Sequence, residues 1–177
     1  MLHRLTQLAL EQGFDQVGPL DPLSLEFLPE VREMCAADRC RSYNKTWTCP
    51  PACGTLEEIS DRCRAYAQGL LLQSTGTLED DFDIEGMQEL EQRHRRSFYG
   101  FVRQAMALCP NALPMGMGSC TLCQDCTWPQ GGPCRHPDLA FPSMEAYGLF
   151  VSRVCERAGM KYYYGPHTMT YTSCILF

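Results

Sequence analysis

The chain has 177 residues, of which 45% are hydrophobic and 20% are charged, and its formal net charge at pH 7 is −6. This length suffices for one hydrophobic core without covalent staples, and the composition is that of a globular protein rather than a disordered one. Because there is no excess of basic residues, we do not expect non-specific binding to nucleic-acid phosphates.

The most unusual feature of the composition is the presence of 12 cysteines. Residues 1–12 carry charged side chains among their leucines and lack the long apolar core of a signal peptide. No segment approaches the roughly 20 apolar residues that span a membrane. We therefore expect a cytoplasmic protein without membrane attachment, in which the cysteines stay reduced and their clustering indicates metal. In a secreted fragment, the even number of cysteines would suit disulfides instead.

The regular elements follow from apolar periodicity and capping signals. Helices are predicted over residues 2–12, 29–35, 56–66, 84–109 and 143–159. Strands are predicted over residues 14–20, 69–74, 161–164 and 169–177, with a turn at Gly165-Pro166 between the last two. Thr55 and Glu58 form the pattern of a capping box. The apolar run from Leu70 to Leu72 suits a strand that is buried on both faces.

Two segments lack any regular period. Residues 40–54 contain Pro50-Pro51, and residues 109–142 are dense in glycine, proline and cysteine. In a compact domain, such long irregular segments are usually functional. We therefore predict an α+β fold with a small sheet and flanking helices. It forms a single compact metal-binding domain over residues 1–177, with cysteine-rich metal-binding loops at about 35–54 and 109–142.

The strongest motif lies in the second loop. Cys120, Cys123 and Cys126 are separated by two residues each, and Cys134 follows after seven more residues. This spacing lets a tight loop direct three thiolates at one centre, and a distant fourth thiolate completes a 4Fe–4S cluster. Zinc sites more often use two separated pairs of ligands. The third close cysteine therefore favours a 4Fe–4S cluster over zinc, although the last gap is longer than in bacterial ferredoxins.

Glycines flank these cysteines at positions Gly116, Gly118, Gly131 and Gly132. We expect them to let backbone N–H groups approach the sulfurs and stabilise a reduced cluster. His136 lies two residues after Cys134. We expect it to donate a hydrogen bond near the cluster or to lie on the surface, rather than to replace a thiolate.

A second group of cysteines occupies the first loop, at positions Cys35, Cys40, Cys49 and Cys53. Their gaps match no standard motif, but four cysteines in an irregular loop of a reduced protein favour a second metal site. Basic residues surround this segment at positions Arg39, Arg41, Lys45, Arg62 and Arg64. They would offset the charge of a cluster, attract an anionic substrate, or form a solvated surface.

The other four cysteines show different patterns. Cys155 lies on the apolar stripe of a predicted helix and Cys174 in an apolar strand, so we expect both to be core residues. Cys63 and Cys109 are close enough in sequence to the two loops to be spare ligands or core thiols.

Several motifs occur together in an order that resembles a known family. They lie at residues 31–35, 47–52, 118–126, 132–135 and 142–148, together with Cys40, Tyr43 and the terminal strand. Nearly the whole chain thus resembles DUF2284, a family of small cysteine-rich proteins described as predicted metal-binding proteins of unknown function.

The resemblance implies metal binding and names no reaction. Cys35, Cys40, Cys49 and the four later cysteines match family positions, whereas Cys53 stands where the family more often has an aliphatic residue. The resemblance therefore suggests a first site with three cysteine ligands. A cluster held by three thiolates leaves one iron open to substrate, sulfide or water.

We therefore predict an iron–sulfur protein that transfers electrons to a redox partner protein or reacts with a small-molecule substrate at an open iron. One 4Fe–4S cluster is expected on Cys120, Cys123, Cys126 and Cys134, and a second metal centre on Cys35, Cys40 and Cys49, with Cys53 as a further candidate. The first alternative is a non-redox module with structural zinc. The second is a cluster-dependent reductase with an additional organic or corrinoid cofactor, because the opening over residues 5–17 loosely resembles the start of cobalamin-dependent reductases.

Overall fold

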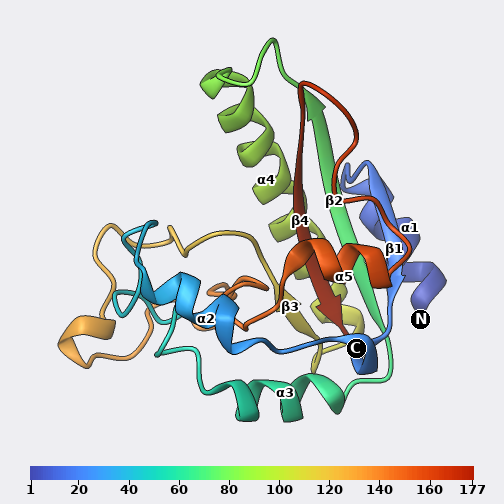
Figure 1. Cartoon of the computed structure of the whole chain (residues 1–177). Helices are drawn as coiled ribbons and strands as arrows, with labels where there is room; N and C mark the ends of the chain where they lie inside the picture. Colours follow the sequence, from blue (N-terminus) through green and yellow to red (C-terminus); the bar gives the residue numbers. More distant parts are fainter.

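Four antiparallel strands form one sheet, in the order β1-β2-β4-β3, in the computed structural model, which describes residues 1–177 (Figure 1). The strands are β1 (Gln16–Leu20), β2 (Gly69–Thr77), β3 (Leu113–Met115) and β4 (Thr168–Leu176). The long central strands β2 and β4 pair along their whole length, from Gly69 opposite Leu176 to Thr77 opposite Thr168. The predicted α+β class with a small sheet is confirmed.

Helices cover both faces of this sheet. They are α1 (Leu2–Glu11), α2 (Pro29–Ala36), α3 (Leu56–Arg64), α4 (Ile84–Leu108) and α5 (Val151–Arg157), with short 3-10 turns η1 (Pro22–Ser24) and η2 (Trp128–Gln130). Helices α1 and α4 pack against each other and against the sheet on one face. Helices α3 and α5 contribute side chains to the core on the other face.

The alternation of side chains along the central strands creates a separate core on each face of the sheet. Leu70 and Leu72 of β2 pack with α1 and α4, whereas Leu71 packs into the opposite core. In β4, Ile175 joins the first of these cores and Cys174 the second. The predicted burial of the Leu70 to Leu72 run on both faces is therefore confirmed.

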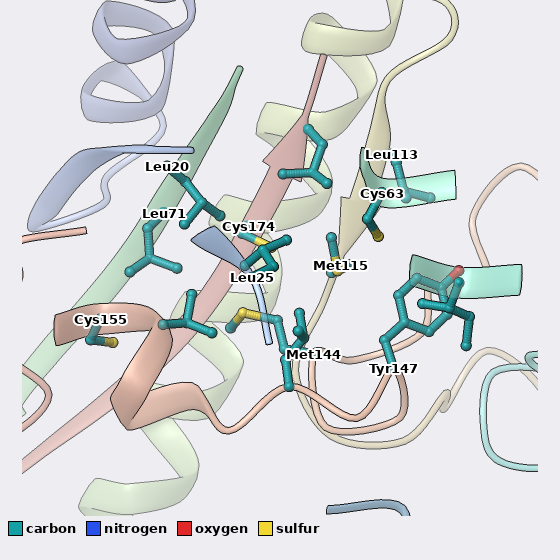
Figure 2. Packing of buried hydrophobic residues seen from close by; sticks show 14 residues of the cluster. Leu20, Leu25, Cys63, Leu71, Leu113, Met115, Met144, Tyr147, Cys155 and Cys174 are labelled. Carbon is teal, nitrogen blue, oxygen red and sulfur yellow. The ribbon is translucent and has the colours of Figure 1, made fainter. Parts of the chain in front are cut away.

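The second core contains residues from the segment that follows the second cysteine-rich loop. The cluster in Figure 2 includes Leu71 and Cys174 of the sheet, Cys155 of α5, and Met144 and Tyr147 of this segment, with Tyr147 on the side opposite Leu71 and Cys155. All five side chains are at least 97% buried, with exposed fractions of 0–3%. The chain that leaves the second loop is thus anchored directly in the core.

The capping box at the start of α3 is present as predicted. The Glu58 backbone N–H donates to Thr55 Oγ1 (3.3 Å), and the Thr55 backbone N–H donates to Glu58 Oε2 (2.8 Å). These two bonds satisfy N–H groups that a helix start otherwise leaves without partners. They fix the first turn of α3 directly after the first cysteine-rich loop.

The helix predicted over residues 143–159 is wrong in its first half, because α5 begins only at Val151. Gly148 has a left-handed φ of +80°, which interrupts any helical run that starts at Ser143. The Gly148 carbonyl instead accepts a hydrogen bond from the Leu28 backbone N–H (2.8 Å). This turn ties the segment before α5 to the start of α2.

The strand predicted over residues 161–164 is also wrong, because β4 already pairs with β2 on one side and with β3 on the other. The Lys161 carbonyl and the Tyr164 hydroxyl instead hydrogen-bond the side chain of buried Gln73, at 2.9 and 2.8 Å. Strand β3 lies inside the segment 109–142, where no strand is predicted; it has only three residues, too few to show a period.

Both cysteine-rich loops lie at one end of the molecule, beside α2 and away from the long strands (Figure 1). No residue between positions 117 and 142 is buried. None of the helices combines the length and the apolar content that a membrane crossing requires.

A buried histidine links α4 to the two central strands. His94 has an exposed fraction of 0%. Its Nδ1 lies 2.9 Å from Ser74 Oγ of β2, and its Nε2 lies 2.6 Å from Ser173 Oγ of β4. Burial, together with the charges of Arg93 and Arg95, lowers the pKa of His94 to about 3. The folded protein therefore holds this imidazole neutral.

We expect the stability of the fold to decrease as the pH falls from 6.5 towards 3, because the unfolded chain takes up a proton at His94 that the folded chain does not. The contribution of His94 to this loss is at most about 1.4 kcal/mol per pH unit. Urea unfolding across this pH range should show a shallower dependence for His94→Gln than for the control His3→Gln, which alters an exposed residue. Equal slopes in both variants would contradict this assignment.

Candidate metal centre

The four cysteines of the second loop line one cavity. Cys120, Cys123, Cys126 and Cys134 surround a space of about 340 Å³. Burial raises the pKa of Cys120, and the charges of the other three thiolates raise it further. The loop therefore brings all four predicted ligands of this site to one place.

Backbone N–H groups approach two of these sulfurs. The His136 backbone N–H donates to Cys134 Sγ (3.4 Å). A hydrogen bond from the Leu122 backbone N–H partly offsets the burial of Cys120 and lowers its pKa. Such bonds stabilise negative charge on a sulfur. The His136 side chain itself is exposed, as one of the two predictions for it stated.

The flanking glycines have a different role from the predicted one. The N–H groups of Gly116, Gly131 and Gly132 donate to backbone carbonyls and not to sulfur. Gly118 and Gly131 instead adopt left-handed φ values of +60° and +70°, which residues with a Cβ rarely take. The glycines thus shape the turns of the loop. The N–H groups that donate to sulfur come from Leu122 and His136, each two residues after a cysteine.

Basic side chains line the four-cysteine cavity at positions Arg41, Lys45 and Arg135. Lys45 Nζ lies 3.0 Å from Asp38 Oδ2, and Arg135 Nη1 donates to the Asp125 carbonyl (2.7 Å). Positive charge here would stabilise a centre made negative by four thiolates. The other predicted basic residues line neither thiol-lined cavity; they are Arg39, Arg62 and Arg64.

The first loop forms a second cavity, of about 140 Å³, which is lined by Cys35 at the end of α2 and by Cys40 and Cys49. Burial raises the pKa of Cys35, and the charges of Cys40 and Cys49 contribute to the rise. Burial also raises the pKa of Cys49, although hydrogen bonds from Thr46 and Thr48 oppose the change. Three thiols of the first loop therefore lie close together.

Cys53 does not line this cavity. Its thiol donates to the Ala146 carbonyl (3.4 Å), and its sulfur accepts a hydrogen bond from Arg32 Nη1 (3.6 Å). Burial raises the pKa of Cys53 to about 11. Three cysteines of the first loop thus line the cavity, whereas Cys53 hydrogen-bonds to Ala146 and Arg32.

The two cavities are neighbours, and each loop forms part of the wall of the other loop's site. Residues between Cys40 and Cys49, among them Arg41 and Trp47, line the four-cysteine cavity. Ser119, directly before Cys120, lines the three-cysteine cavity.

Two tryptophans hold the loops together. Trp47 Nε1–H donates to both the Gly132 carbonyl (3.2 Å) and Thr127 Oγ1 (3.3 Å). Trp128 Nε1–H donates in the opposite direction, to Asn44 Oδ1 of the first loop (2.9 Å). The two indole rings meet edge to face, with centroids 4.7 Å apart and an interplanar angle of 70°. Each loop therefore contributes one indole that hydrogen-bonds to the other loop.

Arg32 of α2 joins the segments around the three-cysteine cavity. Its guanidinium donates to the carbonyls of Ala146 and Gly54, both at 2.7 Å, in addition to its bond with Cys53. Since the planar fork of arginine binds several acceptors in fixed directions, it sets the position of α2 against the loop. The spacing of cysteines gave no signal for this residue or for the two tryptophans.

The donor chemistry of both cavities fits a soft metal. Seven thiols line them, and thiolates select zinc, copper(I) and iron–sulfur clusters over hard cations. No group of three or more histidine, cysteine, aspartate or glutamate side chains is already close enough to hold a metal ion, so the thiols would have to move closer on metal binding.

The remaining cysteines lie elsewhere, and all 12 are free thiols. Cys155 and Cys174 are core residues with exposed fractions of 0%, as predicted. Cys63 belongs to the same core, where burial raises its pKa to about 12. Cys109 packs against the core beneath α1 and α4. None of the four lines a thiol-lined cavity.

Comparison with known families gives one match. The profile of DUF2284, described as a predicted metal-binding protein, covers residues 19–177. The chain belongs to the DUF2284 family. No curated protein and no solved structure matches the chain. DUF2284 membership thus supports metal binding by this fold and leaves the metal and the reaction open.

We expect Cys126→Ser to lose metal from the four-cysteine cavity and to lower the thermal stability of the protein. The reason is that the loop contains no buried residue between 117 and 142 and depends on ligand bonds for its order. Cys155→Ala is the control; it should keep all metal and lose about 1 kcal/mol of stability. Metal analysis and thermal unfolding test both, and full metal content in Cys126→Ser would remove Cys126 from the ligand set.

Proposed function

We propose that this protein is a cytoplasmic iron–sulfur protein with two clusters. A 4Fe–4S cluster would be held by Cys120, Cys123, Cys126 and Cys134, and a second cluster by Cys35, Cys40 and Cys49. The observation that carries the proposal is the division of these seven thiols between two neighbouring cavities, four in one and three in the other.

The spacing of the second-loop cysteines supports a cluster over a single zinc ion, because three of them are separated by only two residues each. Zinc sites more often use two separated pairs of ligands. In a cubane, each thiolate binds a different iron, so the sulfurs stand around a central volume. The four thiols of the second loop line one cavity of about 340 Å³, which has room for such a volume.

When bound, the clusters would supply one-electron transfer, and an iron without a protein thiolate would supply a Lewis-acid position. Residues of the chain would tune the two sites differently. At the four-cysteine cavity, the N–H groups of Leu122 and His136 and the charges of Arg41 and Arg135 stabilise negative sulfur. This environment suits an electron relay.

The three-cysteine cavity suits a reaction or ligand-binding role. Besides the thiols, its lining includes the side chains of Tyr43, Ser119 and Glu145. A small ligand in this cavity would meet hydroxyl and carboxyl groups that can donate or accept a hydrogen bond. Each cavity is walled partly by the other loop, which would let electrons pass between clusters held in the two sites.

The position of the loops suits exchange with a partner. The four-cysteine loop is only partly covered, and no residue between positions 117 and 142 is buried. A redox protein or a small-molecule substrate could therefore approach the relay from solvent. A reducing cytoplasm would keep the 12 thiols available for the metal.

The proposal is tested by a pair of variants in the first loop. Cys49→Ala should lose the second cluster, so that iron falls from about eight to about four atoms per chain. Cys53→Ala is the matched control and should keep about eight, because this thiol is turned to the Ala146 carbonyl. Added cyanide should change the electron paramagnetic resonance spectrum of wild type and of Cys53→Ala and leave that of Cys49→Ala unchanged.

The opposite pattern would contradict the three-cysteine site. Loss of iron in Cys53→Ala, together with a wild-type spectrum that does not respond to cyanide, would establish four protein ligands. The first site would then be a plain electron carrier.

A further inference from the structure

A third cavity, of about 740 Å³, lies beside the four-cysteine site and contains no thiol. Its wall is formed by α3, α4, the chain around β3 and the segment 137–142. Most of its lining is apolar and includes Val102, Met106, Leu113 and Phe141. Its volume lies within the range of about 300–1,000 Å³ that is typical of small-molecule sites.

The cavity shares walls with the four-cysteine site. Trp47 and Ala140 line both cavities. Tyr99 lines the large cavity and also a narrow space that Cys120 lines. A molecule in the large cavity would therefore be separated from the thiol-lined cavity by single side chains.

A tyrosine hydroxyl without a protein partner lies at this cavity. Tyr147 is only 3% exposed as a residue and lines the cavity, and its hydroxyl makes no hydrogen bond to the protein. No fully buried side-chain nitrogen or oxygen lacks a partner, so solvent in the cavity reaches this hydroxyl. Burial of the ring raises the pKa of Tyr147 to about 12, so the group is a hydrogen-bond donor at neutral pH. An acceptor on a ligand would replace the water that this hydroxyl otherwise binds.

Two arginines lie at the same cavity without an acidic partner. Arg62 of α3 and Arg103 of α4 both line it, and neither forms a salt bridge or a side-chain hydrogen bond. Asp138 is the one carboxylate in the lining, so the local charge is positive although the whole chain carries −6. Guanidinium groups bind carboxylates through two parallel hydrogen bonds.

We propose that this cavity is a binding site for an organic carboxylate with an apolar body. The apolar part would occupy the wall around Val102, Met106 and Leu113, the carboxylate would bind Arg62 or Arg103, and the Tyr147 hydroxyl would donate a hydrogen bond to the ligand. The site does not require a particular metal in the neighbouring cavities.

The test uses 2-naphthoate and its uncharged analogue 2-naphthamide, titrated calorimetrically into the full chain purified with its metal. We expect wild type to bind naphthoate at least about tenfold more tightly than naphthamide, because only naphthoate gains an ion pair. Tyr147→Phe, which keeps the ring in the core, should weaken naphthoate binding about tenfold.

A pair of double variants distinguishes binding at this cavity from a general effect of lost positive charge. The variant with both Arg62→Gln and Arg103→Gln should bind the acid no better than the amide. The control with both Arg64→Gln and Arg96→Gln removes the same charge from the same two helices outside the cavity, and it should behave as wild type.

Three results would overturn the proposal: no binding of naphthoate to wild type, equal binding of acid and amide, or equal losses in the two double variants. Thermal unfolding of Tyr147→Phe shows whether its fold is intact. Iron analysis of the same samples reports separately on the cluster proposal, so failure of one proposal is not failure of the other.

Discussion

The two cysteine-rich loops must be held against each other although they have almost no hydrophobic core of their own. From position 117 to 142 no residue is buried, and between 37 and 54 only Thr48, Cys49 and Pro50 are. Two tryptophans, one from each loop, hold the loops together. Trp47 binds the second loop, Trp128 binds the first, and their rings pack together. These contacts join the two loops that carry the seven candidate ligands.

The two loops are attached to the rest of the fold at their ends. Helix α2 ends at the three-cysteine cavity, and Arg32 fixes it to Gly54 and Ala146. The second loop leaves β3 and returns to the core through Met144 and Tyr147. The second loop therefore starts and ends on buried residues, whereas the first loop is held at its ends by the hydrogen bonds of Arg32. The segments between these attachments are left for metal to order. This division is common in small metal-binding domains, where ligand bonds supply part of the folding energy.

Ionisation of the partly buried thiols costs free energy, and metal binding would offset this cost. Burial raises the pKa of Cys35, Cys49 and Cys120, so without metal these groups are protonated at neutral pH. Metal binds the thiolate form, so loading of either cavity must release protons. At the four-cysteine cavity, backbone N–H groups donate to Cys120 and Cys134 and lower the cost of the charged form.

The sequence predicted the elements with strong local signals and missed those set by tertiary contacts. The capping box at Thr55 and the apolar run at Leu70 each act locally, and both predictions hold. The helix predicted from Ser143 fails because Gly148 adopts a left-handed turn to meet Leu28, a contact between distant segments. Cysteine spacing grouped the four thiols that line the cavity of the second loop. In the first loop the spacing matched no motif and grouped Cys53 with the others, and only the family resemblance set Cys53 apart. The spacing gave no sign of Trp47, Arg32 or the cavity at Tyr147, which exist only once the chain is folded.

The most direct test of the account is the metal content of the wild-type protein purified without oxygen. Iron, acid-labile sulfide and zinc are measured per chain, and the electron paramagnetic resonance spectrum is recorded after reduction. Two clusters predict iron and sulfide in equal amounts, about eight of each, with signals of reduced iron–sulfur clusters. A colourless protein that contains zinc and no sulfide would contradict the account, because zinc binds thiolates directly and has no redox chemistry.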